Sequence, residues 1–297
     1  MMDGEKLGCK VGSDVSSETG TEVDSEVVAE AGSDIVACDA GTEALFSRIG
    51  DCDMALSLQY DEAKLIFDYF TARPRESGII VDVGAQFGTS FRPYLQIGWR
   101  AIAFEPDSTK WPTLQKYVAN PLLTLSNKAV GDVPRSDVQF FTSAESTGIS
   151  SLVAFRDSHV PSEKVTQTTL ADELAALHID SIDYLKIDTE GYDYFVLKGY
   201  DWRVLPEVIM CEFDEVKTRH IGKTNHDLAQ LLLRKGYTTW CSAWEPLVKY
   251  GSGHMWHSLT PYESATHQLH NQDAWGNFIA VRGAGVEQMR ELIAPHV

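Results

Sequence analysis

Acidic side chains recur in the sequence directly after short apolar runs, and carboxylates at such positions can bind hydroxyls, hold a cation or accept a proton. The first run, residues 79–83, contains Asp82 and leads into a turn with Gly84 and Gly88. Further acids of interest follow the later runs or close turns behind them: Glu105, Asp132, Asp188, Glu190, and the pair Glu212 and Asp214. Glu105 is placed to accept hydrogen bonds from two ribose hydroxyls, because Rossmann-like nucleoside sites use an acid at the end of the second strand.

The glycine spacing in the first turn helps to distinguish between the possible classes of ligand. A dinucleotide site requires G-x-G-x-x-G and a helix start for the pyrophosphate, whereas this turn has G-x-x-x-G from Gly84 to Gly88. A GK[ST] sequence at P-loop spacing does not occur. The surrounding acids would oppose a pyrophosphate and suit a cationic cofactor that carries a ribose. S-adenosylmethionine, with its sulfonium and ammonium groups, meets that description.

These acids come together only if a parallel sheet brings the strand ends to one edge. Apolar runs alternate with helical patterns, which predicts βαβ units and a parallel sheet covered on both faces. Strands are expected at residues 79–83, 101–104, 122–130, 138–141, 182–187, 207–211, 237–244 and 276–281. Helices are expected at 91–97 and 111–120, after a Thr169 cap, around 195–197, and ending at Gly236. Ligands of such sheets bind at the carboxyl ends of the strands.

Composition divides the chain into a tail and a body. Residues 1–40 hold ten acids against two lysines and no aromatic residue, which predicts a disordered acidic tail. Residues 41–77 are expected to form a helical segment that Pro74 limits, and residues 78–297 a single Rossmann-like domain. Most of the formal net charge of −18 remains on the body. An acidic body disfavours nucleic acid as a partner.

Cysteine usage and hydropathy predict a cytoplasmic protein. The five cysteines are scattered without CxxC pairs, and we expect reduced thiols, with Cys211 and Cys241 packing inside apolar strands. No apolar run approaches the roughly 20 residues of a membrane span. The first residues also lack the basic and then apolar order of a signal peptide. No feature indicates an oligomeric state.

Five motifs occur in an order that resembles the FkbM-type class I S-adenosylmethionine-dependent methyltransferases: VDVGAQFG, AFEPD, NKAVGD, TTLADEL and DYLKIDTEGYDYFVLKG. The resemblance spans about residues 78–282, and KIDTEG with VLKG is its most specific part. It implies an α/β fold, namely a seven-stranded, mostly parallel Rossmann-like sheet with helices on both faces. It also implies transfer of a methyl group, usually to oxygen on sugars or natural products.

The resemblance assigns site residues by motif. The implied cofactor-binding residues are Asp82, Gly84, Ala85, Gln86, Gly88, Glu105, Pro106, Ala129, Asp132 and Asp188. Asp82 and the glycines would line the methionine end, Glu105 the ribose, and residues 129–132 the adenine. Asp188 and Glu190 would face the methyl group as the catalytic carboxylates. Gln86 departs from the usual family Asn, and Glu212 with Asp214 replaces what is often a single Glu.

Several of these residues also have ordinary structural interpretations. The glycines fit a tight turn, and Asp188 and Glu190 could cap the helix that follows. A nucleoside-binding regulatory protein without methyl transfer is therefore an alternative function, and a nicotinamide oxidoreductase is a third. Paired acids at the reactive end of the cofactor favour the methyltransferase.

Methyl transfer to a hydroxyl requires removal of its proton, and two devices could do this. One is a base, either Asp188, Glu190 or a histidine of a late loop. The other is a divalent cation held by Asp188, Glu212 and Asp214 in a metal-assisted O-methyltransferase. We favour the version without metal, because a cationic cofactor also accounts for the carboxylates.

A long insertion precedes the last strand. Residues 249–273 are rich in helix and strand breakers, which indicates a loop, and their length suggests a substrate lid. The four histidines of this segment, His254, His257, His267 and His270, are expected to be solvated rather than metal ligands. Trp256, Tyr262 and Trp275 are expected to form a stacking face. The candidate substrate residues are Trp256, His257 and Trp275, for a small-molecule or carbohydrate acceptor.

Overall fold

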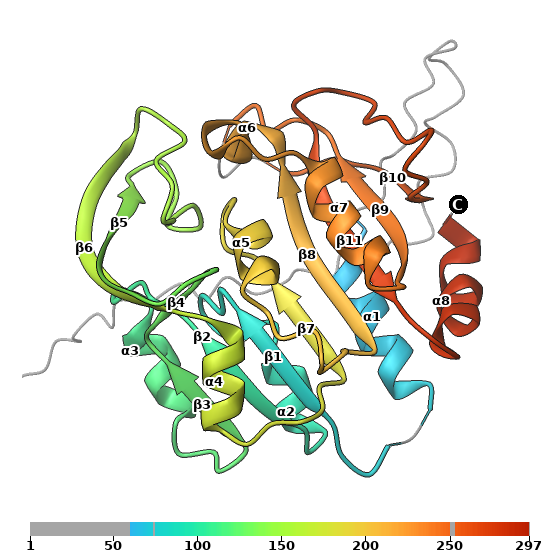
Figure 1. The fold of residues 1–297 in the computed structure, drawn as a ribbon, viewed down its shortest axis with the longest axis horizontal. Coiled ribbons are helices and arrows are strands. Elements are labelled where there is room, and N and C mark those ends of the chain that lie inside the picture. The colour runs from blue at the N-terminus through green and yellow to red at the C-terminus, as the bar shows by residue number, and fades with distance from the viewer. Residues whose placement is uncertain (1–59, 74, 250–252, 297) are drawn as a thin grey trace, which may run out of the picture. The chain divides into compact units, whose positions relative to one another are not determined.

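The structure is a computed structural model, and it describes residues 60–73, 75–249 and 253–296 (Figure 1). The predicted acidic tail and the first part of the predicted helical segment, up to residue 59, lie outside the described residues. Within the described part of that segment, α1 (Glu62–Thr71) confirms the helical expectation. Asp61 begins this helix by accepting a hydrogen bond from the backbone N–H of Lys64.

The main sheet has eight strands in the order β10-β9-β11-β8-β7-β1-β2-β3. Their bounds are β1 (Ile79–Val83), β2 (Arg100–Phe104), β3 (Leu123–Ser126), β7 (Tyr184–Ile187), β8 (Val208–Asp214), β9 (Thr238–Trp244), β10 (Trp256–Pro261) and β11 (Trp275–Val281). Neighbours from β3 to β8 are parallel, whereas β11 is antiparallel to both β8 and β9. The predicted mostly parallel Rossmann-like sheet is thus confirmed, with one strand more than expected.

The additional strand lies in the segment that was expected to be a loop. β10 pairs antiparallel with β9 at the edge of the sheet, so the loop expectation is wrong for residues 256–261. The breakers before it do not prevent pairing, because the exposed edge of β9 satisfies its backbone groups. The expected strand 122–130 is also divided, since β3 joins the main sheet and β4 (Ala129–Val130) leaves it.

A second sheet has the order β4-β6-β5, with β5 (Arg135–Ser143) and β6 (His159–Thr168) forming a long antiparallel ribbon. In Figure 1 this curved ribbon stands beyond the ends of β1 and β2. β6 was not predicted, because its sequence, HVPSEKVTQT, is mostly polar and contains Pro161. Much of β6 is exposed, so an apolar pattern is not required for it.

Helices cover both faces of the main sheet. α4 (Leu170–Ala176), α5 (Asp193–Lys198) and α7 (Asn225–Arg234) pack on one face. The other face carries α1, α2 (Arg92–Gln96), α3 (Trp111–Leu114) and α8 (Gly285–Ile293). The remaining helical turns are α6 (Glu215–Thr218), η1 (Gln115–Tyr117), η2 (Arg219–Ile221) and η3 (Ala294–His296).

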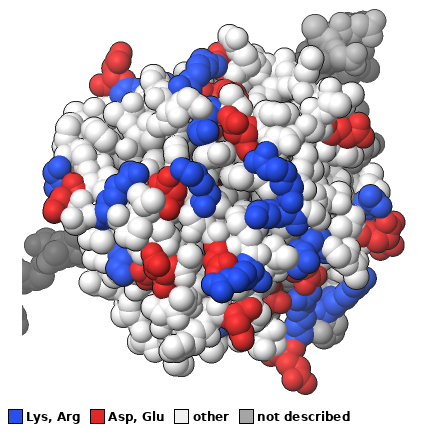
Figure 2. Space-filling model, viewed as in Figure 1, with Lys and Arg blue, Asp and Glu red and all other residues white. Residues whose placement is uncertain are grey.

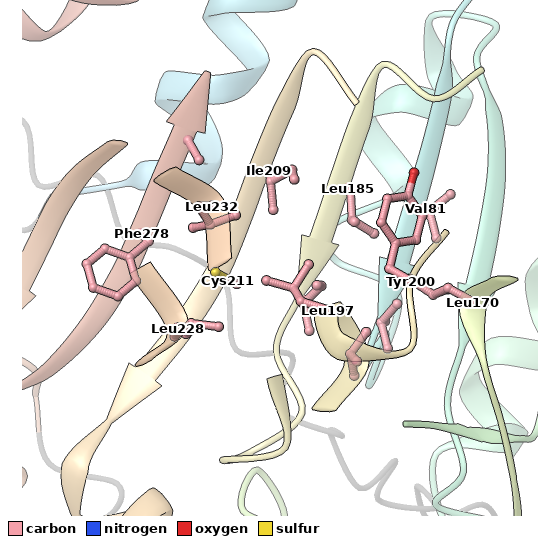
Figure 3. Packing of buried hydrophobic residues seen from close by; sticks show 14 of the residues in the cluster. Val81, Leu170, Leu185, Leu197, Tyr200, Ile209, Cys211, Leu228, Leu232 and Phe278 are labelled. Carbon is pink, nitrogen blue, oxygen red and sulfur yellow. The ribbon is translucent and has the colours of Figure 1, made fainter. Parts of the chain in front are cut away.

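Successive side chains along each strand point to opposite faces of the sheet, and they form one apolar core on each face. Val81, Leu185 and Ile209 point to the α4, α5 and α7 face, while their neighbours Ile80, Tyr184 and Met210 belong to the opposite cluster. Figure 3 shows the first cluster, in which the helix residues Leu197, Leu228 and Leu232 lie among strand residues such as Ile209 and Phe278. Cys211 and Cys241 are buried free thiols in this core, as predicted.

Local signals at two helix ends also behave as predicted. Thr169 caps α4 by accepting a hydrogen bond from the N–H of Asp172, and Gly236 after α7 has a φ of 81°. Among the described residues, no helix is long and apolar enough to cross a membrane.

Candidate active site

A pocket lies at the carboxyl ends of β1, β2 and β7, where rules for parallel sheets place a ligand. The main sheet contributes Gly84, Glu105, Asp188 and Glu190 to its lining. The ribbon and its connection contribute the opposite wall, with Phe140, Thr147, Gly148, Ser150 and Leu152. No described residue of the predicted lid, 249–273, lines this pocket. The β5–β6 connection therefore forms part of the pocket wall.

The turn after β1 is held in a left-handed conformation at Gly84 (φ 86°), Gln86 (φ 48°) and Gly88 (φ 79°). The backbone N–H groups of Gly84 and Ala85 both donate to the carbonyl oxygen of Phe104 at 3.0 Å, which attaches the turn to β2. A Cβ on Gly84 would lie 1.8 Å from the carbonyl oxygen of Asp188, so only glycine fits. Asn adopts positive φ readily, which is consistent with the Asn that the family resemblance implies at the position of Gln86.

Asp82 lies below the pocket and not in its lining. Its carboxylate is fully buried, 3.4 Å from Nζ of Lys186, and burial raises its pKa although Lys186 opposes the shift. Lys186 also lies 3.4 Å from Asp188 and does line the pocket. Burial works against the charge of Lys186, but Asp82 and Asp188 raise its pKa above the ordinary value. Asp82 thus positions a lysine that sequence reasoning overlooked inside YLKIDTEG.

Glu105 directly follows β2 and is almost buried, at 6% exposure. One oxygen accepts a hydrogen bond from the N–H of Gln86 and the other from the N–H of Asp107, both at 2.8 Å. Burial raises the pKa of Glu105 to about 7, against these two bonds, which lower it. Each carboxylate oxygen keeps capacity for one more donor, which suits a pair of vicinal hydroxyls.

An apolar wall lies beside Glu105. Ala129, Val130, Phe140, Leu152 and Tyr192 line this part of the pocket, together with Pro106 from the turn after β2. Asp132, which was expected to border the adenine, is outside the lining. Its carboxylate pairs with Lys198 at 2.7 Å and with Arg135 at 3.5 Å.

The turn after β7 brings a second acid to the pocket. Glu190 has a φ of 55°, and its Oε2 lies 2.6 Å from Nζ of Lys217. Lys217 also donates to both carboxylate oxygens of Glu212 at 2.7 Å and lies 3.6 Å from Asp214. Burial raises the pKa of Glu190 to about 7, and Lys217 opposes that shift.

Lys217 is an internal cation among three carboxylates. Its side chain is 3% exposed, and although burial works against its charge, Glu190, Glu212 and Asp214 raise its pKa well above the ordinary value. The motif CEFDEVK ends with this lysine, but only the acids of the motif were predicted to belong to the site.

The alternative metal ligands are only partly brought together. Ligand oxygens of Asp188, Glu190 and Glu212 lie within 4.8 Å of one another. Asp214 does not join that group, because its carboxylate begins α6 by accepting from the N–H groups of Val216 and Lys217. The Lys217 ammonium already contacts two of the three convergent acids, so the donor set fits a divalent cation poorly.

Asp193 positions the turn that carries both candidate catalytic acids. Its Oδ2 accepts hydrogen bonds from the N–H and the hydroxyl of Thr189, at 3.1 and 2.6 Å. Its Oδ1 accepts from the N–H of Glu212 at 2.9 Å, which connects the turn to β8. Burial raises the pKa of Asp193 to about 6. Sequence reasoning overlooked this residue.

The three predicted substrate residues lie on β10 and β11 and outside the pocket. Trp256 stacks on Tyr60 with ring centroids 4.6 Å apart, and Trp275 stacks on Trp244 at 5.4 Å. His257 lies 2.8 Å from a carboxylate oxygen of Glu245. Their role as a substrate face has no support from the lining.

The parallel core of the sheet, with a pocket at its carboxyl ends, is the Rossmann-like fold of the class I S-adenosylmethionine-dependent methyltransferases. The sequence model of the methyltransferase FkbM domain matches residues 82–239, from β1 into β9 and more than half of the chain. The chain belongs to this family. The family resemblance deduced from the motifs is confirmed, and S-adenosylmethionine is the cofactor that membership implies.

The solved structures that match are distant from this chain in sequence. Precorrin-6y C5,15-methyltransferase from Geobacter metallireducens is 11% identical with a TM-score of 0.39, over 76% of this chain and 90% of that one. The C-terminal domain of the Rhodobacter capsulatus enzyme is 16% identical with a TM-score of 0.37, over 75% and 91%. An rRNA methylase from Streptococcus thermophilus is 8% identical with a TM-score of 0.39, over 76% and 99%. No curated protein matches the sequence.

Proposed function

We propose that this methyltransferase acts on a hydroxyl of a small molecule or carbohydrate, such as a sugar, a glycan or a natural product, without a catalytic metal. The observation that carries the proposal is Glu190, a pocket-lining carboxylate whose pKa burial raises to about 7. A base with a pKa near the working pH is effective at taking a proton from a weakly acidic group.

Three parts of the pocket support the assignment of the cofactor. Glu105 would accept hydrogen bonds from the two ribose hydroxyls, with its oxygens held by two backbone N–H groups. The apolar wall from Ala129 to Leu152 would take the adenine. The turn of Gly84, Ala85 and Gln86, with Asp188 opposite, would hold the charged methionine end.

Two carboxylates would act at the reacting centre. When bound, the cofactor supplies a methyl group already activated on a sulfonium. Glu190 contacts Lys217 through Oε2, which leaves Oε1 to accept the proton of the acceptor hydroxyl. Asp188, 41% exposed in its side chain, would hold the positive end of the cofactor and orient the acceptor. Asp193 keeps both acids in place through Thr189.

Lys217 supports the version without metal. It supplies a positive charge to Glu190 and Glu212, the acids that a divalent cation would need. Charge also supports a small acceptor over a nucleic acid. Figure 2 shows lysine and arginine side chains interspersed with acids over the face in view, and the formal net charge of the chain is −18.

A paired substitution tests the role of Glu190. Purified protein is incubated with methyl-labelled S-adenosylmethionine and fractions of small molecules, glycans, RNA and protein, and then with the acceptor so identified. We expect Glu190→Gln to lower kcat by at least about 100-fold with unchanged cofactor affinity. Glu212→Gln is the matched control, because it also removes a partner of Lys217 but lies outside the pocket lining.

Comparing the two variants distinguishes the loss of a catalytic base from the loss of a charge partner of Lys217. Equal losses in both would mean that Glu190 serves only to neutralise Lys217, and the base assignment would fail. Label found only in RNA or protein would refute the small-acceptor proposal. Cofactor binding without transfer to any fraction would favour the regulatory alternative.

A further inference from the structure

A cluster of two histidines and one glutamate lies apart from the pocket. Ligand atoms of Glu245, His257 and His270 all lie within 4.8 Å of one another. Nδ1 of His257 is 2.8 Å from one carboxylate oxygen of Glu245, and Nε2 of His270 is 3.3 Å from the other. None of the three side chains lines the candidate active site.

Three separate parts of the chain bring these side chains together. Glu245 directly follows β9, where its N–H donates to the carbonyl of Met255 and its carbonyl accepts from Nε1 of Trp275. His257 is the residue at which the pairing of β10 with β9 shifts register. Such a bulge turns a side chain out of the regular alternation. His270 comes from the connection between β10 and β11.

The connection that carries His270 is attached nearby. Arg219 donates to the carboxylate of Asp273 at 2.6 Å and to the carbonyl of Gln272 at 3.2 Å. The two imidazoles are stacked, with ring centroids 3.5 Å apart and planes 7° from parallel. The structure thus brings two imidazoles, from residues 13 positions apart in sequence, against one carboxylate.

We propose that Glu245, His257 and His270 bind a divalent transition-metal ion of the zinc type. Two imidazoles and one carboxylate form a ligand set that Zn²⁺ accepts, with a further position for water. Bonds of about 2.1 Å at tetrahedral angles separate ligand atoms by about 3.4 Å. The two nitrogens lie 2.8 and 3.3 Å from different oxygens of Glu245, and the two rings are nearly parallel, so binding of one ion requires both imidazoles to turn toward it.

The partial exposure of the cluster allows both entry of the ion and this adjustment. Side-chain exposure is 39% for His257, 34% for Glu245 and 19% for His270. Bound metal would join the end of β9, the edge strand β10 and the connection before β11. The site is independent of the proposed methyl transfer, because it uses none of the pocket residues.

Zinc titration of the full-length, chelator-treated and dialysed protein tests the proposal. We expect one saturable site in the wild type, and affinity at least 100-fold weaker in His257→Gln and in His270→Gln. His220→Gln is the matched control, since His220 is exposed and outside the cluster, and its affinity should equal that of the wild type. Unfolding midpoints without metal show that each variant is folded, and Glu245→Gln replaces any variant that is not.

A second readout distinguishes this site from other zinc contacts. Zinc should raise the unfolding temperature of the wild type and of His220→Gln, because the ion binds the folded arrangement, and should not raise it in the cluster variants. Absence of a saturable site in the wild type would overturn the proposal. Retention of wild-type affinity in both histidine variants would overturn it equally.

Discussion

Glu105→Gln is the sharpest test of how the pocket holds its cofactor. The substitution keeps the size of the side chain and removes its charge. It also replaces one carboxylate oxygen by an amide NH₂ group, which cannot accept from the N–H of Gln86 or Asp107. We therefore expect the ribose contacts to weaken while the fold survives.

The magnitude follows from the contacts. Loss of one charged hydrogen bond to the ribose, with weakening of the other, amounts to about 3 kcal/mol, or roughly 100-fold in the dissociation constant. For folding, burial raises the pKa of Glu105 from 4.5 to about 7. Removing the buried charge therefore raises the free energy of unfolding by about 3 kcal/mol at pH 8. Loss of one hydrogen bond from a backbone N–H lowers the free energy of unfolding by about 1–3 kcal/mol, so the net change in that free energy should be less than about 2 kcal/mol.

The sign of the pH dependence is also determined. A carboxyl with a raised pKa favours the folded state when protonated, so its contribution is present at low pH and is lost as pH rises through 7. The stability of Glu105→Gln relative to the wild type should therefore increase between pH 5 and pH 8. Urea unfolding at both pH values measures this difference.

Calorimetric titration with S-adenosylmethionine and S-adenosylhomocysteine measures the binding change. Glu291→Gln, an exposed acid on α8, is the control and should bind both with wild-type affinity. Near-normal affinity in Glu105→Gln would refute the ribose assignment. A loss of binding together with a loss of several kcal/mol in stability would instead mark Glu105 as a structural residue.

Three further predictions concern the turns and the internal cation. Lys217→Met leaves Glu190, Glu212 and Asp214 without their ammonium, so urea unfolding should show a loss of about 3–5 kcal/mol at pH 8. The loss should shrink toward pH 5, because Glu190, whose pKa burial raises to about 7, becomes protonated; an equal loss at both pH values would contradict this. Gly84→Ala should abolish cofactor binding in calorimetry and should destabilise the protein more than Gly98→Ala does. Both glycines have φ near 85°, but only at Gly84 would an added Cβ lie 1.8 Å from a carbonyl oxygen. Equal effects of the two substitutions would exclude this close approach as the cause. Exhaustive chelation should leave cofactor affinity and turnover unchanged, and a loss of turnover that Mg²⁺ restores would show that a cation is needed beside Lys217.

The sequence alone was sufficient for features whose cause is local. The run from Ile79 to Val83, the glycines after it and the Thr169 cap each depend on a few neighbouring residues, and the structure has them as predicted. Alternation of apolar runs with helical patterns was also enough for the class of fold. The motif order was enough for the family.

Only the tertiary structure determined which charges lie side by side and what covers the pocket. Lys186 reaches Asp82 on a neighbouring strand, and Lys217 reaches Glu190 from a different turn, so neither pair has a sequence spacing that predicts it. β6 and β10 form where another strand offers an unpaired edge, although their own residues are polar or preceded by breakers. Strand pairing and charge pairing both depend on what the rest of the chain places nearby. A local pattern therefore locates an acid or a turn, and long-range packing decides its partner.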